Sequence, residues 1–564
     1  MKKLALSMLL LFIPAMSKAA IYDLEPIKIY SLNNNGQDAA NTQNIPNSSS
    51  GVDIQTRVDE GILQDISIRG GTFEDADVRM NGVNLDNPQT GHFNLALPIV
   101  STDIINSKVD LNGQYIDYNL KMPQKNEAMV RVSAGNGGYA DTLISASFGK
   151  NNTFNRFSYE GMRTDGLLPQ TDADKNAVSY TFFHDADFMT SKIYASYLNK
   201  NYGAGGAYGA PWYMAEEEHL EQHYLMSQLT FKQNLDLELT PYIYRTDDTF
   251  FLNRDDRTHN RNDHTMYVYG NNAKSFFLDR LFYGELDVRE ESIDSTNLLE
   301  HNRLVYEMGL GQEEKQFGKF GYNFYGGLLS LDGYPYKFTP KAGIFYDVAQ
   351  GWRVTLDAAR KYRQPSFTEL YYYSPSSHGN NTLVPQQSSN YELGLTRKSS
   401  GWLWRVNGFY RHQENTIDWV KNNSDTFYRA INAGQLEARG FDLKWQYDAN
   451  WKFLKRISAE YTGLFLNKQN NWDMSKYAFE YLQDRLVCKF EQSIGKWDFD
   501  VSYIYEDHIS QKGRSLVNGG VVYKMAPRKS IFLRVDNLFD FDYYELPYIR
   551  GTPVSVKGGM EIKF

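Results

Sequence analysis

The stretch WDFDVSYIYE, residues 497–506, alternates large apolar side chains with polar ones, and Ile504 is its one exception. Successive side chains of a β-strand point to opposite faces of a sheet, so this period of two predicts a strand with one apolar and one polar face. The same alternation recurs at residues 353–359 and 531–536. Because no helical period interrupts the pattern from residue 127 onward, the sequence predicts one very large all-β unit.

A membrane-spanning β-barrel fits this unit. Its strands need an apolar outer face and a polar inner one. The 41 Tyr and 33 Phe suit two interfacial aromatic girdles, and the last strand ends in an aromatic, Phe564. A strand with its turn and loop takes about 20 residues, so residues 123–564 predict an antiparallel barrel of about 22 strands. A secreted β-sandwich array or a propeller would also alternate, but it would not explain the aromatic content.

Residues 1–19 are typical of a secretory signal peptide. Lys2 and Lys3 precede the apolar run Leu4–Ile13, and Ser17 and Ala19 are small residues at the positions that a signal peptidase reads. After this segment no run of 18 or more apolar residues occurs, and the mean hydropathy is -0.55. Transmembrane helices are therefore not expected.

The charge balance argues against a nucleic-acid partner. The chain has 59 Lys and Arg against 68 Asp and Glu, which offers no large basic surface. Its single cysteine, Cys488, cannot form an intrachain disulfide.

The first part of the exported chain divides in two. Residues 20–50 are polar and rich in Asn and Ser, and they predict a mobile arm. Within it, Leu24–Tyr30 could add as a strand to the sheet edge of a partner, although a plain linker explains it equally well. Residues 51–122 predict a small folded unit with short half-buried strands and a tight turn at Asn81-Gly82. This unit is too small to hold a large core alone, and a barrel of about 22 strands is too wide to fill its own bore, so we expect the unit to sit inside the barrel.

Three stretches resemble the TonB-dependent outer-membrane receptors of Gram-negative bacteria. The first, DISIRG at 65–70 with the following NGV and DNPQTGH, resembles the plug of that family. The second, RQPSFTELY at 363–371, resembles its mid-barrel region, and the third, VDNLFD at 535–540, resembles its closing strands. The plug motif comprises Arg69, Gly70, Asn81, Gly82, Asp86, Pro88, Gln89, Thr90, Gly91 and His92.

The resemblance implies active import driven from another membrane. The segment Glu25, Pro26, Ile27, Lys28, Ile29 and Tyr30 is similar to the TonB box, which the periplasmic domain of the energy-transducing protein captures by strand pairing. It also implies an outer-membrane location, contact with membrane lipid and a small-molecule nutrient as ligand. One departure is that residues 104–122 lack the glycine-rich continuation of family plugs, so we expect a shortened plug.

The sequence NPQTGHFNL at 87–95 most resembles the cobalamin-receptor branch of this family. The resemblance predicts import of cobalamin or another corrinoid. No cofactor is required, but calcium could bind two acidic loops, because hard cations prefer several oxygen ligands. The candidate ligands are Asp172, Asp174, Asp247, Asp248, Asp255 and Asp256. A solvated charged loop is the alternative.

Haem or a ferric siderophore is the rival ligand. His378 lies between two short boxes that resemble those of haem receptors, and imidazole is an iron ligand; an ordinary loop residue is the alternative, since similar boxes occur in receptors of other ligands. A large ligand would be held mainly by aromatic side chains, which offer contact area at low entropic cost, unless these residues belong to the aromatic girdle. The candidates are Tyr202, Tyr208, Trp212, Tyr213, Tyr371, Tyr372 and Tyr373.

Two other interpretations are weaker. His219 and His223 have a zinc-binding spacing for a helix, but in a strand they would lie about 13 Å apart, so a zinc site is not expected. An enzyme would need a converging nucleophile, base and oxyanion donors, and no such motif is present. A passive pore or an adhesin remains the alternative from another functional class.

Overall fold

The structure is a computed structural model that describes residues 49–93, 105–208, 215–232, 236–259, 261–278, 280–451, 454–469, 472–476, 481–509, 511, 513–546 and 549–564. The predicted signal peptide and TonB box lie outside the described residues. In the described part of the chain no helix is both long enough and apolar enough to cross a membrane.

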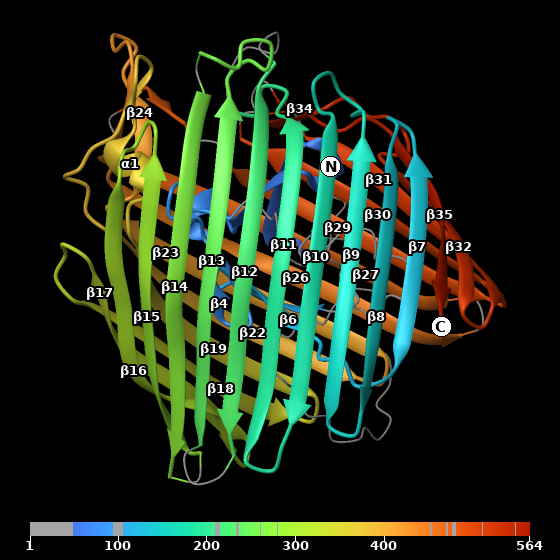
Figure 1. Cartoon of the computed structure of the whole chain (residues 1–564). Helices are drawn as coiled ribbons and strands as arrows, with labels where there is room; N and C mark the ends of the chain where they lie inside the picture. Colours follow the sequence, from blue (N-terminus) through green and yellow to red (C-terminus); the bar gives the residue numbers. More distant parts are fainter. Residues whose placement is uncertain are drawn as a thin grey trace, which may run out of the picture.

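The dominant element is a closed antiparallel barrel of 22 strands, which confirms the predicted fold and strand number (Figure 1). Its first half comprises β7 (Glu127–Gly135), β8 (Ala140–Lys150), β9 (Thr153–Thr164), β10 (Ala173–Asp185), β11 (Met189–Gly203), β12 (Glu217–Phe231), β13 (Leu237–Phe251), β14 (Arg261–Phe277), β15 (Phe282–Ser295), β16 (His301–Phe317) and β17 (Phe320–Leu331). Its second half comprises β18 (Lys337–Ala349), β19 (Trp352–Arg363), β22 (Gln386–Ser399), β23 (Trp402–Glu414), β26 (Gln435–Trp451), β27 (Leu454–Gln469), β29 (Leu482–Ile494), β30 (Trp497–His508), β31 (Arg514–Ala526), β32 (Lys529–Asp536) and β35 (Ser555–Lys563). The last strand, β35, pairs with the first, β7, and so closes the sheet without an edge.

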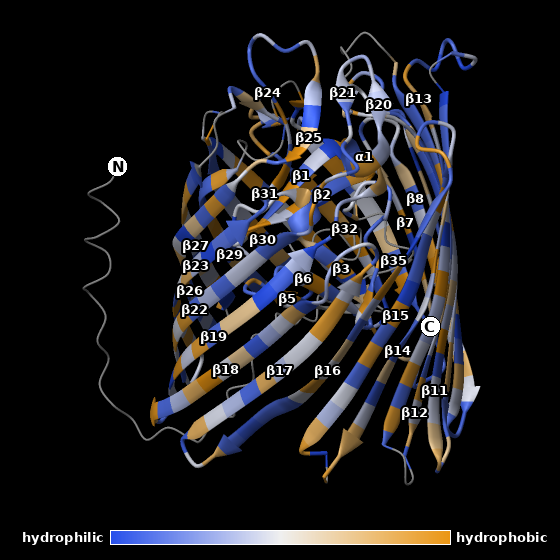
Figure 2. Cartoon of the chain, turned by 90° about the vertical axis from the view of Figure 1, so that its left-hand side faces the viewer, coloured by the Kyte–Doolittle hydropathy of each residue, from blue (hydrophilic) through white to orange (hydrophobic). Residues whose placement is uncertain are grey.

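The alternation seen in the sequence separates the two faces of this wall. In β30, Trp497 and Val501 are exposed on the outside, whereas Asp498 and Glu506 are buried toward the lumen. The same banding of apolar and polar residues runs along β17, β18 and β19 in Figure 2. The apolar side chains of the alternating pattern therefore lie on the outer face of the barrel and the polar ones on the inner face, as predicted.

The plug lies inside the barrel, drawn in blue behind the front strands of Figure 1. Strands β1 (Val52–Val58) and β2 (Leu63–Ile68) form a hairpin around the 3-10 turn Asp59–Gly61, and a second such turn spans Phe73–Asp75. A four-stranded sheet of order β4-β3-β6-β5 follows, made of β3 (Asp77–Met80), β4 (Val83–Asn84), β5 (Ile105–Asp110) and β6 (Tyr115–Leu120). The turn between β3 and β4 is Asn81-Gly82, with φ of 49° and 83°, which confirms the predicted two-residue turn.

The plug completes its core with side chains of the wall. Ile68, Met80 and Tyr118 of the plug share one buried cluster with Tyr194 and Tyr224 of the barrel. One sequence prediction needs correction here: β2 was expected to be half-buried, but all six of its residues are buried. The reason is that the polar face of a strand inside a barrel meets the polar lumen wall and not bulk water.

The remaining elements lie at the upper rim in Figure 1 or in the loops. A short helix, α1 (Phe367–Tyr371), precedes a five-stranded sheet of order β20-β21-β25-β24-β28. Its strands are β20 (Tyr373–Ser374), β21 (Ser377–His378), β24 (Ile417–Lys421), β25 (Tyr428–Asn432) and β28 (Met474–Ser475). Strands β33 (Tyr544–Leu546) and β34 (Ile549–Arg550) form a separate hairpin. Three different loops thus join in one small sheet beside the barrel mouth.

Candidate functional site

A cavity of about 290 Å³ lies between the plug and the barrel wall, beneath the loops that carry α1 and β24. The plug supplies its floor through Pro88, Gln89 and His92. The wall supplies Tyr224 and Tyr244, and further lining residues are Glu218, Asp248, His264, Tyr372 and Trp419. A ligand in this cavity would touch the plug and the extracellular loops at once.

The loop Asn87–His92 of the plug is rigidly built. The Asn87 side-chain oxygen accepts a hydrogen bond from the Gln89 amide at 2.8 Å, and the Asn87 carbonyl accepts one from the Gly91 amide at 2.7 Å. Gly91 has φ of 82°, and a Cβ there would come within 3.2 Å of Ser366. Glycine is therefore required both for the turn and for the close approach to the barrel loop.

Two backbone hydrogen bonds tie this plug loop to the mouth. The amide of Phe367 donates to the Pro88 carbonyl at 3.0 Å, and the amide of Thr368 donates to the Gln89 carbonyl at 2.9 Å. Both donors belong to the first turn of α1, whose amides have no partner within the helix. The plug motif residues Pro88, Gln89, Thr90, Gly91 and His92 thus lie together, against α1.

His92 and Arg57 flank a buried carboxylate of the plug. The Arg57 Nε lies 2.6 Å from Asp65 Oδ2, and the His92 Nε2 lies 3.2 Å from Asp65 Oδ1. Burial opposes the ionisation of Asp65, but the two neighbouring cations outweigh it and hold the pKa of Asp65 below its ordinary value. Burial likewise disfavours charged His92, yet the Asp65 carboxylate raises the pKa of His92 overall.

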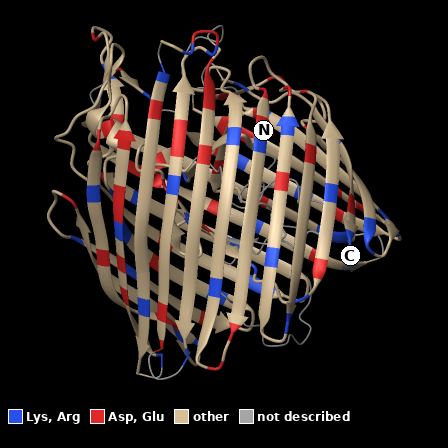
Figure 3. Ribbon diagram, viewed as in Figure 1, with Lys and Arg blue, Asp and Glu red and all other residues tan. Residues whose placement is uncertain are grey.

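Three further carboxylates make the cavity acidic. Glu74, Glu218 and Asp248 line it, and no ion pair joins any of them to a described residue. Glu369 also lines it, but this carboxylate is paired with Arg363 at 2.9 Å. Burial raises the pKa of Glu74 above its ordinary value. Asp and Glu also mark the upper ends of several front strands in Figure 3. The cavity therefore favours neutral or cationic groups over anionic ones.

The aromatic candidates divide into three groups. Tyr208 and Tyr372 line the cavity, and Tyr202 is buried in the wall, with its hydroxyl 3.1 Å from that of Tyr208. Tyr371 and Tyr373 lie outside the cavity, and Tyr371 stacks on His301 with centroids 3.6 Å apart. Trp212 and Tyr213 lie outside the described residues.

His378 belongs to a stack of rings at the mouth. It lies between Tyr373 and Phe427, with ring centroids 4.3 and 3.8 Å away. This position is away from the cavity. His219 and His223 both lie in β12, as predicted, so neither is on a helix.

The six calcium candidates are scattered. Asp172 is held by Arg254 at 2.9 Å, Asp247 by Arg245 at 2.7 Å, and Asp256 lies 2.9 Å from His259. Asp174 in β10 and Asp255 in the loop after β13 are exposed, and Asp248 lines the cavity. Within the described ranges, no three His, Cys, Asp or Glu side chains form a group that could hold a metal ion. Calcium binding stays a prediction.

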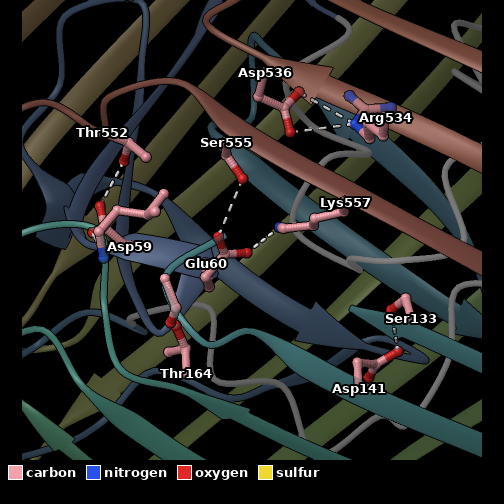
Figure 4. Close-up of polar contacts among 12 residues, drawn as sticks. Asp59, Glu60, Ser133, Asp141, Thr164, Arg534, Asp536, Thr552, Ser555 and Lys557 are labelled. Carbon is pink, nitrogen blue, oxygen red and sulfur yellow. Dashed lines mark hydrogen bonds and ion pairs between the residues drawn. The ribbon is translucent and has the colours of Figure 1, made fainter. Parts of the chain in front are cut away.

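Buried charges attach the plug to the wall. Arg69 lies 2.5 Å from Glu392 of β22 and also contacts Asp442 of β26. At another part of the wall, the turn between β1 and β2 contacts β35 and the residues just before it, where Glu60 pairs with Lys557 and Asp59 accepts a hydrogen bond from Thr552 at 2.8 Å (Figure 4). The remaining motif residues play structural parts: Gly70 has φ of 70°, and Asp86 accepts a hydrogen bond from the Val78 amide at 3.1 Å.

Sequence reasoning missed Glu74, Glu218, Asp248 as a cavity residue, and Trp419. Glu218 lies in the charged run EEEH and Trp419 in IDWV, where nothing local distinguishes a cavity position from a solvated one. The period of two places Glu218 on the lumen side of β12, but it does not distinguish this position from the other lumen-side residues of the strand.

Known proteins resemble this chain in sequence and fold. Residues 109–538 match the family described as TonB dependent receptor-like, beta-barrel. A vitamin B12 transporter of Photobacterium profundum is 26% identical over 229 residues, which is 38% of this chain and 35% of that protein, so the match spans about a third of the relative's length.

Solved structures share the fold at low identity. The copper transporter OprC superimposes with a TM-score of 0.75 at 12% identity, covering 93% of this chain and 97% of OprC. The FrpB iron transporter of Neisseria meningitidis gives 0.74 at 11% identity, covering 94% and 98%. The siderophore receptor PirA of Pseudomonas aeruginosa gives 0.70 at 12% identity, covering 92% and 99%. The sequence match and the plugged barrel together show that this chain belongs to the TonB-dependent receptor family, whose barrels are receptors and not enzymes and lie in the outer membrane of Gram-negative bacteria.

Proposed function

We propose that this protein is an energised importer of a corrinoid such as cobalamin, driven by the periplasmic domain of TonB. The observation that carries the proposal is the cavity whose floor belongs to the plug loop Asn87–His92 and whose roof belongs to α1 and β24. A ligand bound in such a site would contact the plug directly, and the plug is the element that blocks the pore. A passive pore has no need for this arrangement.

The charge of the cavity supports a corrinoid over its rivals. The acidic side chains Glu74, Glu218 and Asp248 give the carboxylates of haem and the anionic groups of many ferric siderophores no cation to pair with. A corrinoid instead carries a rim of carboxamides, whose N–H groups donate to carboxylate oxygens. At about 290 Å³ the cavity would take only one edge of a corrinoid, which Tyr372 and Trp419 would contact. The similarity to a vitamin B12 transporter points the same way.

Calorimetry of the purified full-length protein with cyanocobalamin, haem and a ferric siderophore tests the ligand. We expect cyanocobalamin to bind and Glu74→Gln to weaken it, while the matched control Asp255→Asn, outside the cavity, leaves binding unchanged. Repeating the titration with calcium present tests the predicted calcium sites. Absence of cyanocobalamin binding under both conditions would end the corrinoid proposal.

Deleting residues 20–31, which include Glu25–Tyr30, tests the energy coupling separately. An importer pulled by TonB loses uptake but still binds its ligand. A passive pore keeps its uptake after the deletion, and that result would overturn the coupling without touching the choice of ligand.

A further inference from the structure

The outer surface of the barrel has a hollow of about 730 Å³ that is unrelated to the lumen. It lies over β19, β22, β23, β26 and β27, and its walls are Leu356, Leu393, Phe441 and Phe465. Gly408 of β23 occupies an outward position at its floor, and a Cβ added there would meet no atom within 4 Å. The hollow exists because a glycine stands where neighbouring strands carry large apolar side chains.

The strand register orders the surroundings of the hollow into rows. Leu393, Gly408, Phe441 and Gly463 lie side by side across four strands. The next row toward the extracellular loops is Tyr391, Tyr410, Arg439 and Phe465, and the row beyond it is Ser389, His412, Glu437 and Asn467. The change from apolar through aromatic to polar rows marks the boundary between the acyl chains and the headgroups of the outer leaflet.

Arg439 is the exceptional residue of the middle row. Its side chain is exposed on the lipid side and borders the hollow, and no ion pair or hydrogen bond joins its guanidinium group to any residue in the described ranges. The adjacent polar row contains one carboxylate, that of Glu437, which already accepts a hydrogen bond from the Tyr410 hydroxyl at 3.2 Å. A cation at the membrane surface without a protein partner favours an anionic group from the lipid.

We propose that this hollow binds one molecule of the phosphorylated, multiply acylated glycolipid of the outer leaflet. One acyl chain fills the space above Gly408 between Leu393 and Phe441, and Arg439 donates hydrogen bonds to a glycolipid phosphate. The two rows are about 7 Å apart along the strands, so a chain and the phosphate of the same lipid reach both.

Two substitutions test the two halves of the site. Gly408→Leu fills the hollow and keeps Arg439, whereas Arg439→Gln removes the charge and keeps the hollow. The matched controls are Gly284→Leu, another outward glycine with room for a side chain, and Arg163→Gln, an exposed arginine 3.9 Å from Asp165. Migration of unheated samples on a gel reports whether each barrel is folded, and if Gly408→Leu does not fold, Arg439→Gln alone decides.

The measurement is native mass spectrometry of the delipidated full-length protein titrated with bisphosphorylated lipid A, its dephosphorylated form or phosphatidylethanolamine. We expect the wild type to bind one lipid A, and both variants to bind it about five- to tenfold more weakly, with the controls unchanged. Removing the phosphates should weaken binding to the wild type but not to Arg439→Gln. The proposal would be overturned if all variants bound lipid A equally, or if the wild type bound phosphatidylethanolamine as tightly as lipid A. A wild-type dimer that becomes monomeric in Gly408→Leu would also overturn it.

Discussion

Strand β23 of the barrel wall pairs along its length with β22 and β26 through the backbone, whereas among the described residues plug strand β1 pairs with β2 alone and reaches the wall through side chains. The contacts between the plug and the wall include an apolar cluster and several buried ion pairs, such as Arg69 with Glu392 and Glu60 with Lys557. Backbone ladders in a membrane cannot be opened without leaving polar groups in lipid. Ion pairs in a lumen can be rehydrated as they separate, so we expect the plug to detach from the wall at a lower free-energy cost than the wall opens.

Removing Arg69 should give the largest effect on the plug. Arg69→Met leaves Glu392 and Asp442 buried without their cation, which costs about 3–5 kcal/mol. We expect the plug to unfold at much lower urea concentration while the barrel keeps its stability, measured by plug proteolysis and by gel migration of the barrel. If barrel and plug lose stability together, the two regions are not separable.

A charge on the lipid side should damage the wall instead. Val501 is exposed at the middle of β30, and Val501→Arg should destabilise the barrel by about 2–4 kcal/mol, measured by unfolding in guanidinium in the presence of lipid vesicles. The inward neighbour Ser502→Asp is the control and should change the stability little, because it faces the lumen. Equal losses for both variants would contradict the assignment of the two faces.

The stability of the plug should also depend on pH. Burial, with the nearby Asp77 carboxylate, raises the pKa of Asp86 to about 7, and Lys361 opposes this only in part. Because the folded pKa is higher than the unfolded one, plug stability is full below about pH 4 and falls by about 1.4 kcal/mol per pH unit until about pH 7.

Asp86→Asn should remove this slope from urea unfolding of the plug measured between pH 5 and 7. The variant keeps an oxygen that can accept the hydrogen bond from the Val78 amide. A slope that survives the substitution would assign the pH response to other groups, of which His92 is the first to examine.

The smallest effect concerns the contact between plug and mouth. Ser366 caps α1 by accepting a hydrogen bond from the Glu369 amide at 3.1 Å. Ser366→Ala should loosen α1 by about 1 kcal/mol, and Ser366→Gly by only a few tenths. Hydrogen exchange of the Phe367 and Thr368 amides, which hold the plug loop, provides the measurement, and unchanged exchange in Ser366→Ala would show that the cap does not support this contact.

The part of the site that could be predicted is the part whose signal lies within a few consecutive residues. The loop Asn87–His92 could be recognised because its turn needs asparagine and glycine at fixed positions. Glu74 and Asp248 could not be recognised, since they come from the plug and from β13 and meet only when one folds inside the other. The same holds for the stacking of Tyr371, a ligand candidate from the sequence, on His301, which no local pattern indicated.

The sequence by itself determined the barrel, because the alternation of side chains in a membrane strand is imposed residue by residue by lipid on one side and water on the other. It also determined the tight turns of the plug, because they depend on backbone angles that few residues adopt. Only the tertiary structure decided which carboxylates face the cavity, which wall residues hold Arg69, and that Gly408 opens a hollow between Leu393 and Phe441. These depend on strand register around a closed sheet, where residues far apart in the chain become neighbours.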